Sequence, residues 1–396
     1  MHPMVKPALR RAWRNLKYVQ FGVTPAHAVV VGPIDTTTGS LIDLLDGTRG
    51  MDLLRAEAAA LGRSPEHLEA LLARLADAGL IADASARPTG RADPELDPVR
   101  ADLASLSVVH PAPDGAARAL TARRALRVQV RGAGRVGAAI AALLAAAGIG
   151  HVEVLDSGTV TPWEVSPGGL PPEAVGDRRA RAATRLVRRS TPTGRPPAAT
   201  GPRGGPRDTT GERGGVGAGG GGGGGAPEEA GIALVVVAPR DGLGAYVPDP
   251  LPADAWLATG TPHLYAGVLE ATGVVGPLVL PGGTACAGCM QRELADREPV
   301  WPRLPVQWRS GRRHPLPACD VTLASAVAGL AAAHALSFLD GDLPSSTGAR
   351  WEVSLPLLEW RSEPVRPHPE CGCGARRDGE GERAAGSRGG HDTMAG

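Results

Sequence analysis

The stretch VQVRGAGRVGAAIAALLAAAGIGHVEVLD (128–156) places a strand, a glycine-rich turn, an Ala/Leu-rich helix and a second strand ending in an acid in direct succession. Its turn carries G-x-G-x-x-G at Gly132, Gly134 and Gly137. In such a βαβ unit the first glycine permits the tight turn, the second lets backbone N–H groups approach a phosphate, and the third lets the helix pack close to the sheet. Asp156 falls where an acid reaches ribose hydroxyls. The sequence therefore predicts a Rossmann-like nucleotide-binding half. The motif does not separate NAD, FAD, SAM and ATP, and a turn without a ligand remains the alternative.

The rest of the chain divides by composition. Residues 1–90 read as a small winged-helix-like α+β domain, with short strands at 18–23 and 28–32 followed by helices. The apolar run in GIALVVVAPR predicts a strand of a parallel sheet that is covered on both faces. The predicted organisation is the domain 1–90, a linker 91–125 with a short strand at 105–110, the nucleotide-binding half 126–190, a disordered glycine-rich insert 191–230, the second half of the α/β domain 231–375, and a disordered tail 376–396.

Charge and composition exclude several classes of partner. The formal net charge of the 396-residue chain is +1, so no overall field favours nucleic acid or an anionic membrane. The N-terminus has no continuous apolar segment of the kind found in signal peptides. The apolar stretch 321–339 contains His334 and two serines among its alanines, which favours a buried helix over a membrane span. Five cysteines, an odd number, do not suit a secreted disulfide framework. We predict a cytoplasmic protein that binds neither nucleic acid nor membrane.

Four of the five cysteines have metal-ligand spacing. TACAGC supplies Cys286 and Cys289, and PECGCGA supplies Cys371 and Cys373. Two such pairs can complete a tetrahedral Zn²⁺ site without an open position, which is typical of structural zinc. Ordinary surface thiols and C-x-x-C redox chemistry are the alternatives. The sequence predicts one structural zinc ion.

The remaining candidates are weaker. Cys319 precedes a helix, where a thiol can act as a nucleophile, but a small buried residue at a helix start is the favoured interpretation. His314 and His334 are interpreted in the same way, and His334 is expected to be a satisfied interior histidine.

Taken together, these parts resemble the ThiF/MoeB superfamily, relatives of ubiquitin-activating enzymes. The resemblance covers roughly 126–374 apart from the insert, and residues 1–90 resemble the PqqD-like peptide-recognition domains fused to such proteins in azoline-type ribosomal-peptide biosynthesis. It implies a mostly parallel Rossmann-like sheet, binding of ATP and Mg²⁺, adenylation of the C-terminus of a peptide or small carrier protein, and a homodimer. Within the family pattern, Gly132, Gly134, Gly137 and Asp156 match the glycine loop and the ribose-binding acid.

Other positions depart from the family pattern. Gly158 stands where the family has its second acid. The segment that carries the arginine–glutamine pair of the family ends in this chain with Gly168 and Gly169. Arg179 stands where a lysine would meet the phosphates. Arg240 stands where an acid would help to hold Mg²⁺, with Asp241 one residue on. Arg179 and Asp241 are therefore only weak catalytic candidates.

Two functions follow from the resemblance. In the first, the chain captures a precursor (leader) peptide and presents it to a partner modifying enzyme, YcaO-like or a dehydrogenase, while its ATP site is degenerate. In the second, it is an active adenylyltransferase that uses ATP on a peptide or sulfur-carrier C-terminus. An NAD-dependent oxidoreductase is disfavoured, because no proton-transfer residue or substrate clamp can be located.

Overall fold

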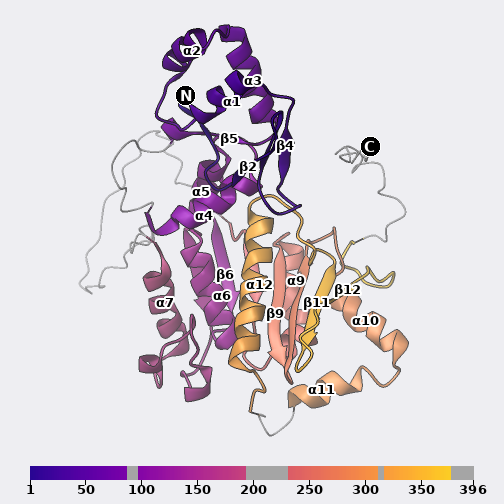
Figure 1. The fold of residues 1–396 in the computed structure, drawn as a ribbon. Helices are drawn as coiled ribbons and strands as arrows, with labels where there is room; N and C mark the ends of the chain where they lie inside the picture. The colour runs from indigo at the N-terminus through magenta and orange to yellow at the C-terminus, as the bar shows by residue number, and fades with distance from the viewer. Residues whose placement is uncertain (87–96, 193–230, 311–315, 376–396) are drawn as a thin grey trace, which may run out of the picture.

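The computed structural model describes residues 1–86, 97–192, 231–310 and 316–375. A seven-stranded sheet forms the centre of the larger part (Figure 1). Its order is β12-β11-β10-β9-β8-β6-β7; β7, β6, β8 and β9 run parallel, and β10, β11 and β12 add antiparallel strands. The strands are β6 (Arg127–Arg131), β7 (His151–Leu155), β8 (Leu234–Val237), β9 (His263–Leu269), β10 (Thr272–Val279), β11 (Ala349–Ser354) and β12 (Arg361–Pro364).

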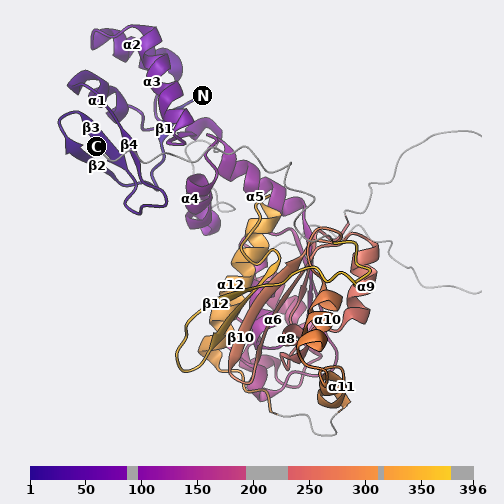
Figure 2. The ribbon, with the colours of Figure 1, turned by 90° about the vertical axis from the view of Figure 1, so that its right-hand side faces the viewer.

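Helices cover both faces of this sheet (Figure 2). On one face α6 and α12 pack against each other, and α7 packs beside α6. The other face carries α8, α9 and α10. Alternation along β8 explains the apolar run, because Leu234 and Val236 join the core under α6 and α12 while Val235 packs with Trp256 of α9. The helices are α6 (Arg135–Ala146), α7 (Arg179–Ser190), α8 (Leu243–Tyr246), α9 (Pro250–Ala258), α10 (Ala287–Arg297), α11 (Arg303–Ser310) and α12 (Val321–Leu339).

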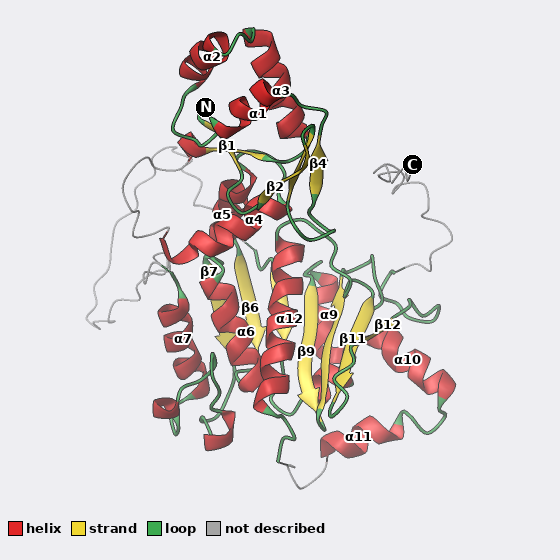
Figure 3. Cartoon of the chain, in the orientation of Figure 1, coloured by secondary structure: helices red, strands yellow, loops and turns green. Residues whose placement is uncertain are grey.

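A smaller α+β unit lies at the top of Figure 3. It holds a two-stranded sheet, β1-β5, a three-stranded sheet, β2-β3-β4, and three helices around a core rich in leucine. The expected strands at 18–23 and 28–32 appear as β3 and β4, whereas β1 and β2 were not predicted. The elements are β1 (Pro3–Val5), β2 (Arg11–Asn15), β3 (Tyr18–Phe21), β4 (Val29–Val31), α1 (Thr36–Asp43), α2 (Met51–Ala60), α3 (Pro65–Asp77) and β5 (Ile81–Asp83). The predicted fold class, a Rossmann-like α/β sheet with an N-terminal α+β domain, is confirmed.

The segment between these parts differs from the prediction. Residues 100–125 form two helices, α4 (Arg100–Val109) and α5 (Gly115–Ala125), so the short strand expected at 105–110 is wrong. Leu103 of α4 and Leu120 of α5 are buried against each other, and this contact favours a helix for a segment whose valines suggested a strand. Residues 87–96, most of the predicted insert and the tail lie outside the described residues.

One described helix is long and apolar enough to cross a membrane by length and composition, namely α12. It packs against α6, β9 and β10. Its small residues, among them Ala324, Ala328 and Ala331, lie in the main core. These contacts agree with the prediction of a buried helix.

His263 makes stability sensitive to acid. Its ring is fully buried on β9 beside Trp256 and Tyr265, with ring centroids 5.1 and 5.5 Å away. Burial lowers the pKa of His263 to about 4 from 6.5. The folded chain therefore keeps this ring neutral while the unfolded chain takes up a proton, so its contribution is complete above pH 6.5 and is lost as the pH falls towards 4. We expect the free energy of unfolding to fall by on the order of 3 kcal/mol over this window.

Denaturant titrations at pH 7, 6, 5 and 4 measure this slope. His263→Gln should flatten it, whereas His151→Gln at the exposed start of β7 is the matched control and should leave it unchanged. Equal slopes in the wild type and His263→Gln would refute the assignment.

Candidate functional site

A large cavity lies at the carboxyl ends of β6 and β8. From β6 the chain crosses through α6 to β7 on one side, and β8 lies on the other side of β6. A crevice forms at such a reversal of strand order, and ligands of open α/β sheets bind there. The cavity has a volume of about 960 Å³ and is lined by both loops and by residues 316, 317 and 319 before α12.

The glycine loop forms one wall of this cavity, and all three predicted glycines line it. Gly132 has φ +114°, and a Cβ there would lie 1.9 Å from the carbonyl oxygen of Ala238. A Cβ on Gly137 would lie 2.1 Å from the carbonyl oxygen of Gly132. These two glycines are required for the turn and for close packing of α6. Gly134 is the N-cap of α6, so the free N–H groups of the first turn open towards the cavity.

Asp156 is already engaged by protein groups. Its carboxylate accepts hydrogen bonds from the backbone N–H groups of Ala133 at 2.7 Å and Ser157 at 2.6 Å, and from Arg179 at 3.1 Å. The side chain is only 7% exposed. The predicted ribose-binding acid therefore lines the cavity, but most of its acceptor capacity is used inside the protein.

Arg179 lies behind the cavity wall rather than in it. Its side chain is 4% exposed and forms ion pairs with Asp156 at 3.1 Å and with Glu164 at 3.2 Å. It also donates to the carbonyl oxygens of Ser157 and Thr159. Among its hydrogen-bond partners are two carboxylates, so this arginine neutralises acids. The structure does not place it among the residues that line the cavity.

Glu164 was not identified from the sequence. It accepts a hydrogen bond from the backbone N–H of Thr161 at 2.8 Å and reaches the same guanidinium as Asp156. The spacing T-x-x-E is that of a capping box, a local signal that marks Glu164 as the acid of a turn. Its place beside Asp156 follows only from the way this turn folds back onto β7.

Arg240 lines the cavity beside the glycine loop, next to the N-cap residue of α6. Its Nε lies 3.8 Å from Asp156 and one Nη lies 3.6 Å from Glu164, and its side chain is 46% exposed. Asp241 also lines the cavity, and its carboxylate accepts from the backbone N–H of Leu243 at 3.2 Å. The described residues here do not fit the Mg²⁺ ion of the family, because a fixed positive charge stands between the two acids that could hold it.

The structure describes two of the three weaker candidates, Cys319 and His334. Burial raises the pKa of the Cys319 thiol, which opposes a nucleophilic role, although Cys319 does line the cavity. Burial lowers the pKa of His334 in α12, and its Nδ1 has no hydrogen-bond partner among the described residues, so the expectation of a satisfied histidine is wrong. His314 lies outside the described residues.

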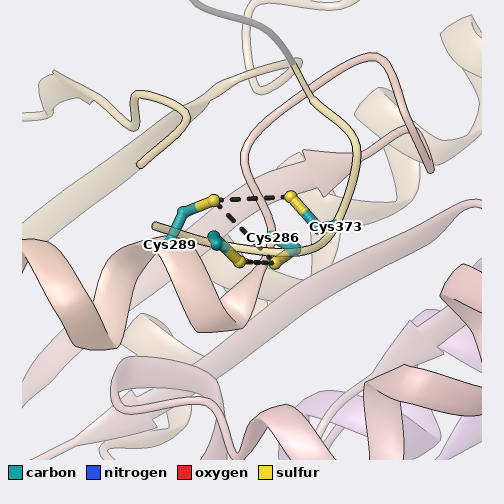
Figure 4. A group of neighbouring side chains, drawn as sticks. Cys286, Cys289 and Cys373 are labelled. Carbon is teal, nitrogen blue, oxygen red and sulfur yellow. Dashed lines mark hydrogen bonds between the residues drawn. The ribbon is translucent and has the colours of Figure 1, made fainter. Parts of the chain in front are cut away.

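The four cysteines of the predicted zinc site meet at the start of α10 (Figure 4). All four sulfur atoms lie within 4.8 Å of one another. Sγ of Cys286 lies 3.9 Å from that of Cys289 and 3.6 Å from that of Cys371, and Sγ of Cys289 lies 3.6 Å from that of Cys373. Four sulfurs bonded to one tetrahedral Zn²⁺ at about 2.3 Å are separated by about 3.8 Å, so these distances fit a zinc ion.

The electrostatics of the cluster also suit a metal. Cys286 and Cys289 are buried, while Cys371 and Cys373 are partly exposed. A hydrogen bond from Cys286 lowers the pKa of Cys289 to about 4, and the same bond raises the pKa of Cys286. A thiolate is the form that binds metal. His368 connects the same segment to α10 through a hydrogen bond between its Nε2 and the carboxylate of Asp296 at 3.0 Å.

Solved structures share this fold. Escherichia coli MccB with MccA-N7isoASN has a TM-score of 0.65 at 13% identity, with 95% of this chain and 100% of that chain covered. E. coli MccB with ATP has a TM-score of 0.63 at 13% identity, with 94% and 99% covered. PaaA has a TM-score of 0.64 at 16% identity, with 92% and 100% covered. At these identities the likeness shows the fold alone.

The sequence itself matches a family model. No curated protein sequence matches the chain. The model of the ThiF family matches residues 113–195 and 248–374, which together make up more than half of the chain. The first segment holds the glycine loop and Asp156, and the second holds the four cysteines. The chain therefore belongs to the ThiF family.

Proposed function

We propose that the chain binds a precursor (leader) peptide with its N-terminal unit and presents it to a partner modifying enzyme in the cytoplasm, while the cavity at the glycine loop does not activate ATP. The partner would be YcaO-like or a dehydrogenase. The proposal follows the domain division given above, with residues 1–90 as the peptide-recognition part. The observation that carries it is the position of Arg240 between Asp156 and Glu164. The N-terminal sheet, whose outer strands are unpaired on one side among the described residues, offers the place for the peptide.

The N-terminal unit offers main-chain groups to an extended peptide. In the order β2-β3-β4 both outer strands lack a second neighbour among the described residues. All five residues of β2 are exposed. Trp13 on β2 and Val30 on β4 are large apolar side chains at these edges, 48% and 43% exposed. A peptide that adds a strand gains affinity from main-chain hydrogen bonds and selectivity from such side chains.

The similar structures support a peptide as ligand. MccB has been solved in complex with N-formylated MccA and with MccA-N7isoASN. These complexes belong to MccB, and the step from that protein to this chain is part of our proposal.

We expect residues 1–125 alone to fold and to bind a leader peptide encoded near the gene, with an affinity within about threefold of the full chain. This fragment is preferable to 1–90, because Lys6 donates to the carbonyl oxygens of His110 at 3.2 Å and Pro111 at 3.1 Å. Lys6 is 1% exposed, so a fragment that ends at residue 90 would lose both acceptors of this ammonium group together with part of its cover. Fluorescence anisotropy with a labelled peptide measures the affinity.

A scrambled peptide of the same composition is the control for this measurement. A cooperative thermal transition shows that the fragment has folded. A folded fragment that binds none of the neighbouring peptides would reduce the unit to a packing domain and remove the peptide-recognition assignment.

The second function, an ATP-dependent adenylyltransferase acting on a peptide or a small carrier protein, is favoured by one observation. The cavity is large enough for a nucleotide, and Asp241 lines it one residue from the expected metal-binding position. A shift of this loop by one residue would bring the carboxylate of Asp241 to the position of Arg240. The exchange experiment in the Discussion separates the two functions.

A further inference from the structure

The cavity at the glycine loop contains a balanced set of charges. Three arginines and three carboxylates line it, and the buried guanidinium of Arg179 lies directly behind two of the acids. The site therefore has a small excess of positive charge before any ligand or metal binds, to which the first turn of α6 adds its free N–H groups. The lining groups are Arg131, Arg135, Arg240, Asp156, Glu164 and Asp241.

Two of the lining arginines are committed to protein acceptors. Arg131 donates to the side chain of Gln129 at 2.9 Å and stacks over Trp256 at 4.9 Å. Arg135 donates to the carbonyl oxygen of Cys319 at 2.7 Å. Neither guanidinium can move to a ligand without giving up these contacts.

Arg240 is the lining arginine with the weakest attachment. Its contacts with Asp156 and Glu164, at 3.8 and 3.6 Å, are longer than hydrogen bonds. Both acids also hold Arg179 at 3.1 and 3.2 Å, so they stay partly neutralised if Arg240 turns away. Its Cγ lies 3.1 Å from where a Cβ of Gly134 would be, so the side chain already lies over the glycine loop.

We propose that Arg240 is a built-in counter-cation, and that the cavity binds a phosphate monoester through this guanidinium and the glycine loop without a divalent metal. This inference rests on the proposed function, in which the site does not activate ATP, and adds the class of ligand that the site takes. A guanidinium carries a fixed charge and two parallel donors that match a phosphate. On binding, Arg240 exchanges its two long carboxylate contacts for the ligand, and Arg179 keeps Asp156 and Glu164 balanced.

The charge balance selects the ligand. A single guanidinium and a helix N-terminus suit the two negative charges of one phosphate monoester, whereas the four charges of ATP exceed what these groups balance without a divalent cation. Trp163, half exposed in the cavity wall, offers a ring to a base. AMP is therefore the probe of choice.

Isothermal titration of the full chain with AMP, in EDTA and in Mg²⁺, tests the inference. We expect the dissociation constants in the two buffers to agree within about twofold. Arg240→Ala should weaken AMP binding at least about tenfold, the loss that follows from removing a charge-assisted contact. Arg240→Lys, which keeps the charge but loses the paired donors, should bind AMP with an affinity between those of the wild type and Arg240→Ala. Arg240→Asp should abolish binding in EDTA and should create a Mg²⁺ site measurable with the metal alone.

Arg181→Ala is the matched control, because this exposed arginine lies on α7 and does not line the cavity. Thermal unfolding shows that each variant is folded. The inference is overturned if wild type binds AMP only with Mg²⁺, if it does not bind AMP at millimolar concentration, or if Arg240→Ala binds AMP as wild type does. Peptide binding by the same variants is measured separately, so loss of the proposed peptide function is distinguished from failure of this inference.

Discussion

Purified protein is expected to contain about one zinc ion per chain, and Cys371→Ser is expected to lose that ion and to melt at a temperature lower by roughly 5 °C or more. The reason is the position of the cluster. Cys371 and Cys373 belong to the segment after β12, whereas Cys286 and Cys289 belong to the start of α10. Zinc would fasten this last described segment to the sheet, and without it four close sulfurs would remain as an unpaired, partly charged group.

Metal analysis by mass spectrometry and a thermal scan with and without a zinc chelator measure both effects. Cys319→Ser is the matched control, because it is the one cysteine outside the cluster and should retain zinc. If the purified protein contains no metal, and if neither the chelator nor Cys371→Ser changes its melting temperature, the cluster consists of four ordinary thiols.

The second large effect concerns adenylation, which we expect the chain not to catalyse. We expect ATP–pyrophosphate exchange with any candidate peptide to be at least about a thousandfold below that of an active ThiF-family enzyme. Adenylation needs positive groups and Mg²⁺ that offset charge developing on the α-phosphate, and each lost stabiliser typically costs a hundredfold or more. The glycine loop and α6 would bind the ground state and the transition state alike, and such uniform binding does not accelerate a reaction.

Exchange of labelled pyrophosphate into ATP, with and without Mg²⁺, measures this rate. An active family member assayed in parallel shows that the peptide and buffer are competent. Robust magnesium-dependent exchange that disappears in Asp241→Ala would show that the loop has rebuilt a metal site, and would make the chain an adenylyltransferase.

Short sequence patterns correctly predicted those features of the fold that depend mainly on residues close together in the chain. The βαβ unit depends on contacts within about thirty residues, and the spacing of its glycines follows from backbone geometry, as the close approach of Gly137 to the carbonyl oxygen of Gly132 shows. The cysteine pairs likewise carry their own spacing, although the meeting of Cys286 with Cys371 needs the whole sheet between them. The helix α4 was missed because it is stabilised by α5 rather than by its own sequence.

The chemistry of the cavity depended on contacts that no local pattern specifies. Arg240 could be identified from the sequence as an arginine at an acid's position, but its place beside Asp156 and Glu164 could not. Glu164 approaches Arg240 from a turn after β7, and Arg179 approaches both acids from α7. Charges brought together by tertiary structure decide whether such a site holds a metal, so the family motif alone was insufficient.

The helix α12 joins two distant parts of the molecule. At its C-terminal end Asp340 pairs with Arg123 of α5, at 2.8 and 2.5 Å, in a contact where both side chains are 7% exposed. Cys319, two residues before the N-terminal end of α12, lines the cavity, and its carbonyl oxygen accepts a hydrogen bond from Arg135. Nineteen helical residues span about 28 Å. The junction with the N-terminal unit and the wall of the cavity therefore lie at the two ends of one continuous helix, so a tilt of this helix at one end would also move its other end.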